Sequence, residues 1–122
     1  MKKKIYIAGQ VTGEDFREVA VKFAKAHAEI EKLGFIPINP IELVQNYFIK
    51  NVAFQPITED EEWKIAMQEC IKALVECDAV VLLPCWEKSK GAKIERQLAE
   101  DLGIQIFNFN KYGLEVMANN LR

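Results

Sequence analysis

Apolar residues gather in short runs that are separated by longer stretches with helical spacing. The runs predict four strands, at residues 4–8, 35–38, 78–83 and 104–109. The run at 78–83 is the most apolar of the four and does not alternate with polar residues. A strand of this kind is covered on both faces, so we expect it near the centre of a sheet.

Between and after these strands, apolar positions recur every three or four residues. They predict helices at residues 14–33, 41–48, 58 to about 77, 90–102 and 114–121. Gly34 and Gly103 follow two of these helices and are typical C-terminal caps. Thr58, with Glu61 three residues later, forms a capping box, and residues 49–57 predict a loop in front of it.

Strands that alternate with helices indicate a parallel sheet with right-handed crossovers. The predicted fold class is α/β, a three-layer flavodoxin/Rossmann-like sandwich with a parallel sheet of four to five strands in the order 2-1-3-4. In that order the first and third strands are neighbours. The loops at 9–13 and 84–91 would then converge on one crevice at the carboxyl ends of the strands, where such sheets bind ligands.

Composition narrows the functional classes. The 122 residues predict a single domain, 1–122, and the net charge of -2 gives no reason to expect nucleic-acid binding. The apolar run at residues 5–8 is too short for a signal peptide or a membrane span. Three cysteines without CxxC spacing and a single histidine indicate neither a disulfide framework nor a metal site. We therefore expect a cytoplasmic, metal-free protein with no membrane partner.

Glu95 carries the sharpest chemical signal in the chain. It lies four residues after Gly91 and three before Leu98, on the stripe of the predicted helix 90–102 that should be buried. A carboxylate there is costly unless it is paired, hydrogen-bonded or used in chemistry. Two other interpretations stay open: a structural carboxylate bonded to a backbone amide or to Tyr6, and a slight rotation of the helix that exposes Glu95.

The start of the same helix is a candidate phosphate site. Ser89 can cap the helix, Gly91 has no side chain to block approach to the amide groups, and Lys88 and Lys90 add positive charge. A helix N-terminus presents free N–H groups and a partial positive charge, which suit a phosphate. A plain serine cap on a surface helix explains the same residues.

The loop after the first strand is a second candidate, and it consists of Gly9, Gln10, Val11, Thr12 and Gly13. Its two glycines let the backbone bend and approach a ligand closely. The loop matches neither GxGxxG nor a Walker pattern, so an ordinary strand-to-helix turn is the simpler interpretation.

Three further side chains have weaker claims. Trp86 lies in the loop after the third strand and could stack on a base or a sugar, whereas Trp63 fits the buried stripe of its helix. Asn39, after the second strand, could donate to a ligand or bond its own turn. Cys85 has no histidine near it in the sequence that would activate it.

Four segments together resemble a known family: KIYIAG at residues 4–9, Asn39-Pro40, CDAVVLLPCW at 77–86 and SKGAKIE at 89–95. They resemble the DUF4406 family, which is similar to the nucleoside 2-deoxyribosyltransferases and the 2'-deoxynucleoside 5'-phosphate N-hydrolases. The resemblance covers roughly residues 4–109, and its specificity lies in the combination of the segments.

The resemblance implies an N-glycosidase or deoxyribosyltransferase-like enzyme that acts on a small-molecule nucleotide or nucleoside and needs no metal or organic cofactor. In the similar enzymes, a glutamate at the position of Glu95 attacks the sugar, and a tyrosine at the position of Tyr6 assists it. The position of Ser89 is aspartate in enzymes for nucleosides and serine in those that hold a 5'-phosphate, which favours a nucleotide. Residues 10–12 would line the sugar and base pocket.

One position departs from the pattern of these enzymes. They carry an aspartate eight residues before Asp78 that helps to orient or protonate the substrate, but this chain has Cys70, and Glu69 points about 100° away on the helix. A non-catalytic nucleotide-binding module of the same fold is therefore the alternative. The resemblance also implies a homodimer or higher homo-oligomer, to whose sites the tail after Tyr112 could contribute. A structural or regulatory homo-oligomer is a third interpretation.

Overall fold

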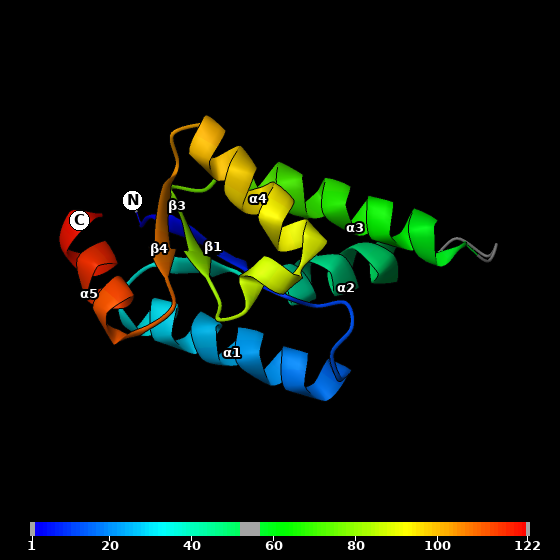
Figure 1. Ribbon diagram of the computed structural model, residues 1–122, viewed down its shortest axis with the longest axis horizontal. Coiled ribbons are helices and arrows are strands. Elements are labelled where there is room, and N and C mark those ends of the chain that lie inside the picture. Colours follow the sequence, from blue (N-terminus) through cyan, green and yellow to red (C-terminus); the bar gives the residue numbers. More distant parts are fainter. Residues whose placement is uncertain (1, 52–56, 122) are drawn as a thin grey trace.

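Four parallel strands form the centre of the molecule. The computed structural model describes residues 2–51 and 57–121. Within them the sheet has the order β2-β1-β3-β4 (Figure 1), and its strands are β1 (Lys4–Ala8), β2 (Ile36–Ile38), β3 (Ala79–Leu82) and β4 (Gln105–Asn108). Each pair of neighbouring strands is parallel. The predicted strands, their order and their direction are confirmed.

Helices cover both faces of this sheet, which confirms the three-layer sandwich (Figure 1). One face packs against α1 (Phe16–Lys32) and α5 (Lys111–Asn120). The other face packs against α2 (Pro40–Lys50), α3 (Glu59–Leu74) and α4 (Lys90–Asp101). A short 3₁₀ helix, η1 (Trp86–Lys88), lies between β3 and α4. In the described part of the chain, no helix combines the length and the apolar character needed to cross a bilayer.

The two central strands determine which side chains enter each core. β1 and β3 pair in the register that sets Tyr6 beside Val80, and Ile5 to Ala8 are all buried. Successive side chains of a strand point to opposite faces. Ile5 and Ile7 therefore pack with α1 and α5, whereas Tyr6 and Ala8 face the layer of α2, α3 and α4. This alternation directs the Tyr6 side chain towards α4.

Several helix boundaries differ from their predicted positions. α1 begins at Phe16 rather than at residue 14, because the Asp15 carboxylate accepts hydrogen bonds from two amides of the first turn. α5 begins three residues early, since Asn110 caps it. α2 runs from Pro40 to Lys50, so the predicted loop 49–57 begins later, and its residues 52–56 lie outside the described chain.

The predicted caps at Thr58, Gly34 and Gly103 are confirmed, whereas α3 ends at Leu74 rather than at about residue 77. Thr58 Oγ1 accepts from the amide of Glu61 at 3.1 Å and so caps α3. Gly34 and Gly103 have φ of 92° and 73°, in the left-handed region that glycine adopts without strain after a helix.

Candidate active site around Glu95

Glu95 is buried in the layer between α4 and the sheet, with 5% of its surface exposed. The interpretation in which a rotated helix exposes it is therefore wrong. Its carboxylate Oε2 accepts a hydrogen bond from the Tyr6 hydroxyl. The two residues are 89 positions apart in the sequence, and they meet because β1 directs Tyr6 towards the face of the sheet that α4 covers.

Burial and this hydrogen bond act on the Glu95 pKa in opposite directions. Removal from water disfavours the charged carboxylate and raises the pKa, while donation from Tyr6 stabilises the charged form and lowers it. Burial is the larger effect, and the pKa rises from 4.5 to about 7. With a pKa in this range, a fraction of the molecules carries an ionised Glu95 at neutral pH, so the group can act as a nucleophile or a base there.

Cys70 is the third member of this buried cluster. It belongs to α3, is 6% exposed, and packs in the same buried cluster as Tyr6, where each of the two groups affects the pKa of the other. Burial raises the pKa of the thiol to about 12, and burial together with Glu95 raises the pKa of Tyr6 well above 10. Both groups therefore keep their protons at neutral pH. The neighbouring Glu69 does not take the place of an acid here, because its carboxylate is paired with Lys72 at 3.0 Å.

The start of α4 has the predicted serine cap. Ser89 Oγ accepts a hydrogen bond from the amide of Ala92 at 3.1 Å, and Ser89 is partly exposed. The amides of Lys90 and Gly91 precede the first intrahelical bond, which Lys93 donates to the Ser89 carbonyl. Amides at this point of a helix have no intrahelical acceptor, so they can bind an anion.

Packing against α3 constrains the two residues that follow Ser89. A Cβ atom on Gly91 would lie 3.0 Å from Met67 Sδ, so the missing side chain serves helix packing as well as access to the amides. The Lys90 ammonium lies 4.9 Å from the centre of the Trp63 ring. A cation over an indole face is attracted to it. Lys90 is thus held on α3, and the partly buried Trp63 packs at the helix interface rather than in the core.

The connection between β3 and α4 contains a strained residue. Cys85 has a φ of 67°, the left-handed region that non-glycine residues seldom adopt. Its exposed thiol precedes η1, whose first residue is Trp86. The Trp86 ring packs against the core beneath α4, and the Arg96 guanidinium covers it at 5.2 Å from the ring centre. Because Arg96 occupies one face of this ring, base stacking there would require Arg96 to move.

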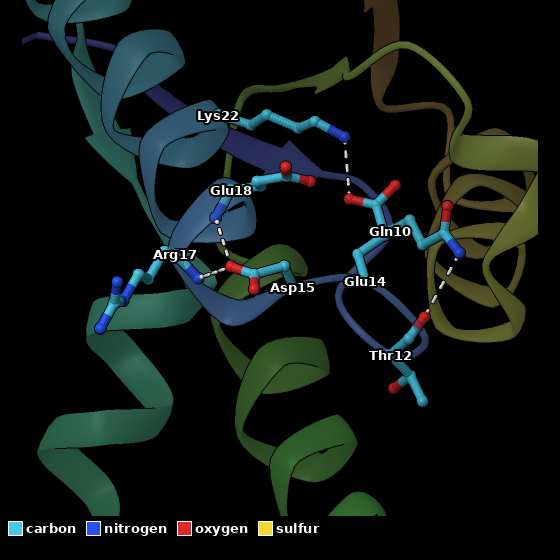
Figure 2. A network of polar contacts seen from close by, with 7 residues as sticks. All are labelled: Gln10, Thr12, Glu14, Asp15, Arg17, Glu18 and Lys22. Carbon is cyan, nitrogen blue, oxygen red and sulfur yellow. Dashed lines mark hydrogen bonds and ion pairs between the residues drawn. The ribbon is translucent and has the colours of Figure 1, made fainter.

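The β1–α1 loop is held in place by its own polar contacts (Figure 2). Gln10 Nε2 donates to the Thr12 carbonyl at 3.3 Å, and Lys22 pairs with Glu14 at 2.8 Å. Val11, Thr12 and Gly13 are exposed and Gln10 is partly exposed, so four of the five predicted loop residues are accessible. The fifth, Gly9, is buried.

Gly9 is the point where the two candidate loops meet. A Cβ atom on Gly9 would lie 2.8 Å from Leu83 Cδ1, and the Leu83 amide donates to the Ala8 carbonyl at 2.8 Å. The loops after β1 and β3 therefore leave the same edge of the sheet, side by side. Asn39 follows β2 at this edge too, but its Oδ1 accepts from the Ile41 amide at 3.0 Å and caps α2, which is the turn interpretation.

The sequence matches the family described as "Domain of unknown function (DUF4406)" over residues 3–108. The chain belongs to the DUF4406 family. No curated protein matches it. A similar solved structure is that of a 2-deoxyribosyltransferase from the psychrotolerant bacterium Bacillus psychrosaccharolyticus, with a TM-score of 0.62 and 18% identity. The match covers 86% of this chain and 70% of that chain, and at this identity it concerns the fold.

The DUF4406 chain also has features that the sequence reasoning missed. One is that Cys70 of α3 packs beside Tyr6 of β1, which is far from it in the sequence. The other is that Arg96 of α4 covers the ring of Trp86 in η1. The signal in the sequence for Arg96 is its place on the predicted helix 90–102, which directly follows the loop that carries Trp86. Among the described residues of this DUF4406 protein, no three histidine, cysteine or acidic side chains are grouped to hold a metal ion.

This chain also has a surface depression on the side of the sheet that α1 and α5 cover. Residues of α1 and α5 line it, together with Pro84 and Phe109 from the loops after β3 and β4. Neither Glu95 nor Tyr6 belongs to its walls. We place the candidate site at Glu95 because the buried carboxyl and its two partners are there, whereas none of the described residues that line the depression is a buried polar one.

Proposed function

We propose that this DUF4406 protein is an N-glycosidase or deoxyribosyltransferase-like enzyme that cleaves the N-glycosidic bond of a nucleoside 5'-monophosphate. The observation that carries the proposal is the buried Glu95, hydrogen-bonded to Tyr6 and with its pKa raised to about 7. Perturbed carboxyl groups of this kind mark functional sites. The fold likeness to a 2-deoxyribosyltransferase supports a nucleoside or nucleotide as the substrate.

In the proposed reaction, the ionised Glu95 attacks C1' of the sugar while the base leaves. The transition state resembles an oxocarbenium ion, and the product of this step is an ester between the sugar and Glu95. Water or a second base then attacks C1' from the opposite side and releases the carboxylate. Tyr6 is a positioning residue, because its hydroxyl holds the Oε2 atom of Glu95.

The 5'-phosphate would bind at the N-terminus of α4. Ser89 and the amides of Lys90 and Gly91 supply donors there, and they belong to the same helix as Glu95. Residues 10–13 and Gly9, on the neighbouring loop, would line the sugar and the base. Trp86 would contribute to the base side once Arg96 moves from its ring. Asn39 keeps its cap and stays a lesser candidate.

Release of free base from a panel of ribo- and deoxyribonucleoside 5'-monophosphates, separated by chromatography, tests this function. We expect release by the wild type, none by Glu95→Gln, and wild-type release by Asp101→Asn, which neutralises an exposed carboxylate at the end of the same helix. The unphosphorylated nucleosides should be cleaved less well. Equal release by Glu95→Gln and wild type would exclude Glu95 as the nucleophile.

The second candidate function is a non-catalytic nucleotide-binding module. The observation that favours it is Cys70, a thiol with a pKa of about 12 in the cluster where a second acid would assist catalysis. Calorimetric titration with the same nucleotides distinguishes the two functions. Binding that Ser89→Ala weakens, without release of base from any substrate, would support the module. A homodimer or higher homo-oligomer stays a prediction, which light scattering of the protein in solution tests.

A further inference from the structure

The surroundings of Glu95 contain one carboxyl group and two very weak acids. Glu95 is the one acidic side chain that is buried among the described residues. Its partners are a hydroxyl, from Tyr6, and beyond it the thiol of Cys70. The two causes of the Glu95 pKa shift are burial and Tyr6, and no second charged group contributes. Within the buried cluster that the described residues form, there is a nucleophile but no second carboxyl group to act as the general acid.

A single carboxyl group cannot serve as nucleophile and general acid in the same step. Attack on C1' requires the ionised form, whereas proton donation to the leaving base requires the protonated form. Tyr6 and Cys70 hold their protons too tightly to replace the acid at neutral pH, since both pKa values are strongly raised. A neutral base that leaves without a proton departs as an anion, which is a poor leaving group in a buried site.

A base that already carries a positive charge avoids this difficulty. When the bond between C1' and the ring nitrogen breaks, its electron pair stays on the nitrogen and cancels the positive charge, so the base leaves as a neutral molecule. The sugar is transferred to the Glu95 carboxylate, and water then attacks the ester. The released sugar gains the hydroxyl of that water, and the second proton of the water passes to solvent. Each turnover thus releases one proton, with no general acid in the step that cleaves the bond.

We propose, resting on the function proposed above, that this site selects N-glycosides whose base is cationic, such as N7-alkylated purine or pyridinium nucleoside 5'-monophosphates, over those with a neutral base. Glu95 with Tyr6 and Cys70 is the arrangement that carries the inference. The negative charge of the ionised carboxylate also favours a cationic base over a neutral one in a site shielded from water.

The test compares N7-methylguanosine 5'-monophosphate with guanosine 5'-monophosphate, and nicotinamide mononucleotide with uridine 5'-monophosphate, together with the available deoxy forms. Each enzymatic rate is divided by the spontaneous rate of that compound at the same pH, because cationic bases also leave faster in water. General acid catalysis contributes about 10²–10⁴-fold, so we expect the normalised rates of the cationic compounds to be higher by at least about 100-fold. A pH indicator should report one proton per molecule of base.

A variant pair tests the same idea within the cluster. Cys70→Asp supplies a carboxyl group beside Tyr6 and should narrow the ratio between cationic and neutral substrates by about tenfold or more. Cys70→Ser keeps a neutral group and should preserve the ratio. Circular dichroism checks that both variants fold, and the wild-type comparison stands by itself if Cys70→Asp does not.

The outcomes separate this inference from the function on which it rests. Equal normalised rates for cationic and neutral bases, abolished in Glu95→Gln, would overturn the selectivity and leave the N-glycosidase standing. No cleavage of either class would overturn the N-glycosidase and the selectivity together. Faster cleavage of the cationic class, lost in Glu95→Gln, is the result that we expect.

Discussion

Replacing Tyr6 by phenylalanine removes the hydroxyl that donates to Glu95 and leaves the ring in the core. A hydrogen bond to a buried charged group contributes about 1.5–3 kcal/mol, and Glu95 is almost completely buried, so little solvent screening applies. One pH unit corresponds to about 1.4 kcal/mol. We therefore expect the pKa of Glu95 to rise by about one to two pH units above its wild-type value of about 7.

The shift changes how much nucleophile is present at neutral pH. The ionised fraction of Glu95 at pH 7 should fall from about half to between about 1% and 10%. If ionised Glu95 is the attacking group, the rate at pH 7 should fall by about 5- to 50-fold in Tyr6→Phe and recover as the pH rises above the new pKa. Loss of the fold would give no such alkaline recovery.

Carbon-detected NMR of protein labelled at the glutamate carboxyl groups measures the titration without any substrate. Glu95→Gln identifies the resonance, and Tyr112→Phe is the matched control, because Tyr112 is 75% exposed on α5. We expect an unchanged midpoint in Tyr112→Phe and a higher one in Tyr6→Phe. An equal or lower midpoint in Tyr6→Phe would refute the reasoning, since it would mean that the hydroxyl does not stabilise the charged carboxylate.

Three further predictions concern stability, each measured by urea unfolding. Folding raises the pKa of Glu95 from 4.5 to about 7, so the protonated group stabilises the folded state below pH 4.5 and this stabilisation is lost as the pH rises through 7. The free energy of unfolding of the wild type should therefore fall by about 3 kcal/mol over this range. Glu95→Gln should lack this loss, and an identical pH dependence would contradict the shift. Gly113→Ala should lower the free energy of unfolding by about 3 kcal/mol, because the added Cβ would lie 2.0 Å from the Asn108 carbonyl oxygen. Gly91→Ala should change the free energy of unfolding by less than about 1 kcal/mol, because the close contact of its Cβ is with the flexible end of Met67. Equal losses in the two variants would contradict this account. Ser89→Ala should cost about 1 kcal/mol through loss of its bond to the Ala92 amide, and no change would mean that this cap is unimportant.

Local patterns predicted most of the architecture. The apolar runs identified the four strands of the described residues, and the spacing of apolar positions identified the five α-helices found there. The errors lay at helix ends, where one side chain decides the boundary. Asp15 and Asn110 each bond amides of the first turn, and a sequence with several polar candidates in a row does not show which of them does so.

The sequence by itself placed Glu95 on the apolar stripe of α4, because that placement follows from helical period, and the structure then excluded the rotated helix that would expose it. It also determined the serine cap at Ser89, since capping depends on residues within one turn. Only the tertiary structure decided which groups surround Glu95. Tyr6 comes from β1 and Cys70 from α3, and their meeting depends on the register of β1 with β3 and on the packing of two helices over one face of the sheet. The pKa of Glu95 is decided there too, because burial beneath α4 raises it and the long-range hydrogen bond from Tyr6 partly offsets that rise.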